Sequence, residues 1–192
     1  MGLSFSYLVC SATGTVDLTR PAPAAAADEV VRRLFPRTPW RRTASRRLLD
    51  ERIAPRERPA IGVFDDGILI ATRDAHLYDP AILHRRYHRF TEWPDLRLLT
   101  TLSANDMFAY GHWTRAALTR RFSVNATAGV WVDDGTPDAF EGGRPISADR
   151  WLDLCNGALA TILRLSGDLG PALPDAVAWE DVELHVFERT DR

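Results

Sequence analysis

Short apolar runs, several of them alternating with polar residues, recur along this chain of 192 residues, which is the pattern of β-strands. The first covers residues 3–10, where alternate positions are apolar. The clearest local signal is at 60–72, where two β-rich runs flank Asp65-Asp66-Gly67. This triplet predicts a hairpin turn, because glycine readily adopts the positive φ that tight turns require.

A longer series of strands is predicted in the second half of the chain. The candidates are 96–102, 107–113, and 121–125 continuing to 130–132. A second turn signal, Asp133-Asp134-Gly135, follows them, and residues 182–187 form a last strand. Short connections between consecutive strands favour an antiparallel meander.

Three segments have helical patterns. One begins near Asp28 and ends before Pro36, one covers 79–90 with Pro80 in its first turn, and one covers 147–166 with Ser147 as cap. Strands and helices together predict an α+β protein, a single domain over 1–192. Its antiparallel-rich mixed sheet is expected to pack against two or three helices.

The segment 36–59 is the hardest to assign. It contains eight arginines, from Arg37 to Arg58, and several prolines. A short helix at 44–53 and a mobile arm or loop both fit this composition.

Composition excludes several chemistries. All 24 basic residues are arginine, so Schiff-base, pyridoxal-phosphate, phosphate-loop and kinase lysines are all ruled out. The net charge of −2 is unevenly spread: 19 Arg against 13 Asp+Glu (+6) in 1–121, and 5 against 13 (−8) in 122–192. Cys10 and Cys155 are too few for a disulfide framework and are expected in the core.

No targeting or membrane segment is expected. The first ten residues lack a cationic leader, and no apolar run reaches 18 residues, so we expect a cytoplasmic protein that does not enter a membrane. No glycine-rich fingerprint lies between a strand and a helix, and no cofactor or metal is expected.

Patches over about two-thirds of the chain resemble a family of uncharacterised proteins, mostly from actinomycetes, known only as a domain of unknown function. The matching stretches are Met1-Gly2 with the strand to Cys10, 33–36, 62–64 and 106–124. Ser11-Ala-Thr-Gly14 departs from the aspartate and glycine pair that is common in the family after the first strand. The resemblance implies no activity, cofactor or catalytic residue.

Two groups of residues are candidates for chemistry. His84 and His88 are four residues apart on the predicted 79–90 helix, but Arg85, Arg86 and Arg89 beside them argue against a metal ion. The stretch fits either a solvated basic helix face or a face that contacts an anion. In the strand at 107–113, alternation predicts that Asp106, Tyr110 and His112 share one face. Such a row fits either general acid/base catalysis or a satisfied polar row at a sheet edge.

These observations favour a non-catalytic binding or accessory module for a small anionic ligand or an acidic protein partner. Its expected ligand-binding residues are Arg41, Arg42, Arg46, Arg47, His84 and His88. The alternative is a small enzyme that uses Asp106, Tyr110 and His112. Nucleic-acid binding through 37–58 is a third, weaker hypothesis, because a pI near 6.2 is low for a polyanion-binding protein.

Overall fold

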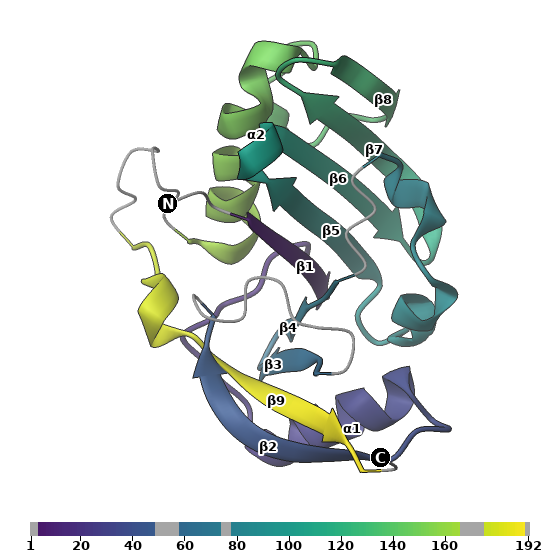
Figure 1. Ribbon diagram of the computed structural model, residues 1–192, viewed down its shortest axis with the longest axis vertical. Coiled ribbons are helices and arrows are strands. Elements are labelled where there is room, and N and C mark those ends of the chain that lie inside the picture. The colour runs from purple at the N-terminus through teal and green to yellow at the C-terminus, as the bar shows by residue number, and fades with distance from the viewer. Residues whose placement is uncertain (1–3, 49–57, 74–77, 166–174, 191–192) are drawn as a thin grey trace.

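Nine antiparallel strands form one sheet in the computed structural model, which describes residues 4–48, 58–73, 78–165 and 175–190 (Figure 1). The strand order is β2-β9-β3-β4-β1-β5-β6-β7-β8. The strands are β1 (Ser4–Ser11), β2 (Trp40–Arg47), β3 (Ala60–Phe64), β4 (Gly67–Ala71), β5 (Asp95–Leu102), β6 (Met107–Thr114), β7 (Ala117–Asn125), β8 (Gly129–Gly135) and β9 (Glu183–Arg189). The predicted meander is confirmed as β5 to β8, although the run from 121 to 132 forms two strands with a turn between them.

The two α-helices pack on opposite faces of this sheet. Helix α2 (Trp151–Ala158), which continues as the π-turn η6 (Leu159–Leu163), contributes to the core on one face, and α1 (Ala24–Leu34) to the core on the other. We call these the α2 face and the α1 face. The described elements therefore make an α+β protein in which the sheet dominates and every neighbouring pair of strands is antiparallel, where a mixed sheet was expected.

Burial on both faces explains the apolar character of the central strands. In β1, Phe5 and Tyr7 lie in the α2-face core, whereas Leu8 and Cys10 lie in the α1-face core. Cys155, a residue of α2, is fully buried, so both cysteines are core residues, as predicted. Among the described residues, no helix has both the length and the apolar character needed to cross a bilayer.

The hairpin predicted at 60–72 is confirmed, but the reason for its glycine differs. Asp65 and Asp66 form the two-residue connection, and Gly67 is the first residue of β4. Gly67 does not adopt a positive φ. A Cβ there would lie 2.5 Å from both the Cys10 carbonyl oxygen and Val16 Cγ2, so the position requires glycine because the backbones approach closely.

The prediction of a second turn at 133–135 is wrong. These residues are the end of β8, where Asp133 lies opposite Phe122 and Asp134 opposite Arg121 of β7. Salt bridges to arginines of β7 stabilise the two carboxylates within the strand, which offsets the low β-propensity of aspartate.

The arginine-rich segment also differs from expectation. Residues 40–47 form neither a helix nor a loop: they are the edge strand β2, which pairs with β9. The rest of the predicted helix, residues 49–53, lies outside the described residues. The register of β2 places Arg42 opposite Phe187 on the α1 face and Arg46 opposite Leu184 on the α2 face. Alternation then puts Arg47 on the α1 face and Arg41 on the α2 face, so the four predicted ligand-binding arginines are divided between the two faces.

The helix predicted at 79–90 is replaced by two 3-10 turns, η1 (Pro80–Ile82) and η2 (Arg85–Arg89). His84 lies between them as the cap of η2, where its Nδ1 accepts a hydrogen bond from the Arg86 amide. With three residues per turn, positions four apart point in different directions, so His84 and His88 do not share one helical face.

The helix predicted at 147–166 is confirmed in its buried stripe. The 3-10 turn η5 (Ala148–Arg150) leads into α2 and then η6, and Leu154, Ala158 and Ile162 are all fully buried. Ser147 makes no cap with the backbone, since its hydroxyl donates to Asp149.

Candidate functional site

Tyr110 and His112 lie together on the α2 face of β6, as predicted, and bind two carboxylates. The Tyr110 hydroxyl donates to Asp138 Oδ2 at 2.7 Å, and His112 Nδ1 donates to the same oxygen at 3.0 Å. His112 Nε2 donates to Asp95 Oδ2 at 2.8 Å, and Arg97 Nε donates to Asp95 Oδ1 at 2.7 Å. We call these five side chains the His112 network.

The network fixes the protonation state of each member. Burial lowers the pKa of His112, but the hydrogen bonds to Asp138 and Asp95 outweigh burial and raise it from 6.5 to about 9. Burial raises the pKa values of Asp95 and Asp138, yet their bonds to His112 and to Arg97 or Tyr110 bring both below the ordinary value. At neutral pH two carboxylates therefore face two cations, His112 and Arg97.

This arrangement leaves little capacity for proton transfer. Both ring nitrogens of His112 carry protons and donate to carboxylates, so the imidazole has no lone pair to accept a proton. Burial raises the Tyr110 pKa well above its usual 10, so the phenol also stays protonated. The network joins β5, β6 and the segment that follows β8.

Asp106, the third residue of the predicted row, lies outside this network. It is exposed at the opposite end of β6, in a left-handed conformation with φ of 50°, and precedes the strand. The carboxylate expected beside Tyr110 and His112 is therefore that of Asp138 and not that of Asp106. The one sequence signal for Asp138 is the spacing Asp138-Ala-Phe-Glu141, which is that of a capping box.

A buried ion pair holds Asp138 in place. The Asp138 amide donates to Glu141 Oε1 at 2.9 Å, and the same carboxylate receives two hydrogen bonds from Arg120, at 2.9 and 2.7 Å. Only 3% of the Arg120 side chain and 1% of that of Glu141 are exposed. Since a fork of two charge-assisted bonds is directional, the pair fixes the position of the segment that presents Asp138.

Positive charge gathers at a different place, where the C-terminal half of α1 meets η2. The stretches 29–37 and 84–92 contain six arginines and two glutamates, an excess of +4. Arg33 Nη2 donates to the Arg89 carbonyl and Arg89 Nη1 to the Arg33 carbonyl, each at 2.7 Å. The Arg33 guanidinium lies 4.6 Å from the centre of the Phe90 ring. These contacts hold the two side chains in fixed orientations.

A pocket of about 450 Å³ adjoins this basic surface. Its walls include the aromatic residues Tyr87, Phe90 and Trp93 from η2 and the following loop, together with His88, Glu92, Arg115 and Ala116. Glu92 is already paired with Arg33, which neutralises its charge. The pocket therefore combines aromatic surface with cationic Arg115, and we call it the Arg115 pocket.

The turn that supplies Arg115 is strained. Arg115 and Ala116 connect β6 to β7 with φ of 50° and 65°, in the left-handed region that side chains with a Cβ disfavour. The Arg115 amide donates to the Pro94 carbonyl at 2.7 Å, which ties the turn to the other side of the pocket. Strain of this kind is often retained where a turn contacts a ligand.

The structure thus separates the residues predicted to bind ligand. His88 lines the Arg115 pocket, and its ring packs edge-on against Trp113 at 5.6 Å, while burial lowers its pKa. His84 caps η2, and the β2 arginines are divided between two faces. Sequence reasoning missed Asp95, Arg97, Asp138 and Arg115. No group of three or more metal-ligating side chains occurs in the part of the chain that the structure describes.

Comparison with known proteins gives a family but no characterised relative. A model of a family of unknown function matches residues 7–187, nearly the whole chain. No curated protein and no solved structure matches.

Proposed function

Because the chain belongs to DUF6928, a family of unknown function, membership brings no activity with it, and we propose from the geometry that this protein is a non-catalytic binding module for a small anionic ligand. The Arg115 pocket carries the proposal. It combines a cavity of ligand size, aromatic walls and an arginine beside an excess of positive charge.

Each part of the pocket has a role in recognition. Arg115 supplies forked donors for a phosphate, sulfate or carboxylate. His88, whose pKa is lowered by burial, is neutral at pH 7 and offers a hydrogen bond without charge. Tyr87, Phe90 and Trp93 provide area for a planar ring. The ligand class that fits is a small aromatic or otherwise planar anion.

The same geometry argues against the competing hypotheses. The enzyme hypothesis needs His112 as a base, and both of its nitrogens are engaged by carboxylates. Nucleic-acid binding needs the arginines of 37–58 on one surface, and those of β2 are divided between two faces. An acidic protein partner would contact the +4 surface but would leave the Arg115 pocket beside it unfilled.

Titration with 4-methylumbelliferyl phosphate tests the proposal, with binding followed by fluorescence polarisation and by calorimetry. Arg115→Gln, which keeps a Cβ in the strained turn, should weaken binding roughly tenfold through loss of one charge-assisted bond. The exposed Arg144 lies outside the pocket, so Arg144→Gln is the matched control and should bind as the unmodified protein does.

Two results would count against the proposal. Equal affinity of Arg115→Gln and Arg144→Gln would show that the pocket does not hold the anion. Release of free 4-methylumbelliferone by the protein, and by Arg115→Gln at a reduced rate, would show that the site is catalytic.

A further inference from the structure

The sheet opens between β3 and β9. These two strands pair at only two positions, Ala60 with Val186 and Ile61 with His185. Beyond them β9 stays with β2, while the far half of β3 is paired on that side by the segment 18–24: the Ala22 amide donates to the Val63 carbonyl at 2.8 Å. The separation of β9 from β3 is visible in Figure 1.

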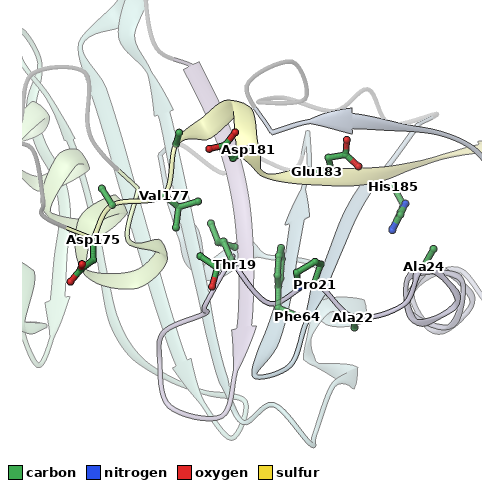
Figure 2. Close-up of a pocket in the computed structure, with 13 residues that line it drawn as sticks. Thr19, Pro21, Ala22, Ala24, Phe64, Asp175, Val177, Asp181, Glu183 and His185 are labelled. Carbon is green, nitrogen blue, oxygen red and sulfur yellow. The ribbon is translucent and has the colours of Figure 1, made fainter.

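A pocket of about 770 Å³ occupies this opening, and we call it the β3–β9 wedge. One wall is β9 with Glu183 and His185, together with Asp181 just before the strand, and the other is the segment 18–24 with the end of β3 (Figure 2). Leu18, Phe64 and Val177 provide apolar surface between them.

Backbone groups of β9 face into the wedge. The Val182 carbonyl accepts from Leu48 on the β2 side, whereas the Phe187 amide donates to Pro59 on the β3 side. In an antiparallel strand, the amide and carbonyl of one residue point to one side and those of the next residue to the other side. Since the Val182 carbonyl points toward β2, the amide and carbonyl of Glu183 point away from β2, into the wedge. Among the described residues they have no partner strand, which makes this stretch of β9 an unpaired edge inside a cavity.

Side chains along the wedge are sorted by face. Ile61, opposite His185, lies in the α1-face core, so Glu183 and His185 point to the α1 face. Phe64 and Leu18 belong to the α2-face core. Asp181 and Glu183 are exposed and form no ion pair with any described residue. Asp181 and Glu183 therefore make the lining of the wedge acidic, with Arg47 of β2 opposite Glu183 on the α1 face, and Phe64 and Leu18 make its α2 side apolar.

We propose that the β3–β9 wedge is a docking groove for an extended peptide in which basic and apolar residues alternate. The peptide adds a strand against β9, with its backbone hydrogen-bonded to Glu183. Its basic side chains point to the α1 face and meet Glu183 and Asp181. Its apolar side chains point to the α2 face and contact Phe64, Leu18 and Val177. This site is separate from the Arg115 pocket.

A fluorescein-labelled hexapeptide of alternating arginine and valine is the probe, with binding measured by fluorescence anisotropy. It should bind more tightly than a hexapeptide of the same composition in which three arginines precede three valines. N-methylation of every second amide of the peptide removes hydrogen-bond donors without changing its charge. In an added strand only every second amide points toward β9, so methylation of that set should abolish binding and methylation of the other set should not.

Variants of the protein test the acidic face. Glu183→Gln should weaken binding of the alternating peptide about tenfold. The matched control is Glu188→Gln on the same strand, because Glu188 lies opposite Arg41 outside the wedge. Affinity for 4-methylumbelliferyl phosphate should stay unchanged in Glu183→Gln, which separates this proposal from the Arg115 pocket.

Three outcomes would overturn the proposal: equal binding of the alternating and segregated peptides, no loss on N-methylation of either set, or equal effects of Glu183→Gln and Glu188→Gln. Any of them would mean that the peptide is held by net charge alone, without strand addition.

Discussion

Deprotonation of His112 at alkaline pH should destabilise the protein. The folded-state pKa of about 9 lies above the usual 6.5. A group whose pKa is raised by folding stabilises the folded state fully below its unfolded pKa, and this contribution is lost as the pH rises through the folded pKa. The loss should begin near pH 6.5 and be nearly complete above pH 9.

The size of the effect follows from the shift. A rise from 6.5 to about 9 corresponds to a free energy of about 3 kcal/mol. The His112 side chain is 13% exposed, and its carboxylate partners are 15% and 18% exposed, so solvent screens part of this interaction. We therefore expect a loss of about 2 kcal/mol from the free energy of unfolding.

Urea unfolding of the unmodified protein and of His112→Gln across this pH range measures the effect. Cys10, whose pKa is raised to about 12, and Tyr110 also remove stability at high pH, so the difference between the two proteins isolates His112. The difference should shrink steadily between pH 6.5 and 9. NMR titration of the imidazole gives the pKa directly. A constant difference, or an imidazole pKa at or below 6.5, would refute the reasoning.

Three further predictions concern stability and reactivity. Ala116→Gly should raise the free energy of unfolding by about 0.5–1 kcal/mol, because glycine relieves the left-handed strain; a loss of stability would show that the turn is unstrained. Glu141→Gln should lower it by about 2 kcal/mol in urea unfolding, since the buried Arg120 guanidinium would keep only its ion pair with the part-exposed Asp133, and a change below about 0.5 kcal/mol would contradict this. Cys10 and Cys155 should react with Ellman's reagent only after unfolding, because both are buried; reaction in the folded protein would show otherwise.

The predictions that the structure confirms are those that rested on local sequence patterns. The hairpin at 60–72 and the meander from 96 to 132 follow from alternation and short connections, and both are present. The segment 40–47 had no such signal: its arginines are exposed on an edge strand, and only pairing with β9 keeps it extended. The spacing of apolar residues in 79–90 predicted a helix, but the segment forms two 3-10 turns. In this conformation Tyr87 and Phe90 pack into the α1-face core, so tertiary packing overrides the local pattern.

Sequence alone determined the strands other than β2, and that Tyr110 and His112 share a face, because both depend on the two-residue repeat of a strand. It did not determine the partners of that pair. Asp95 and Asp138 lie 17 and 26 residues from His112, and only sheet register and the Arg120–Glu141 ion pair bring them within hydrogen-bond distance. The Arg115 pocket and the β3–β9 wedge likewise exist only in the folded chain, since each is built from segments that no short-range pattern relates.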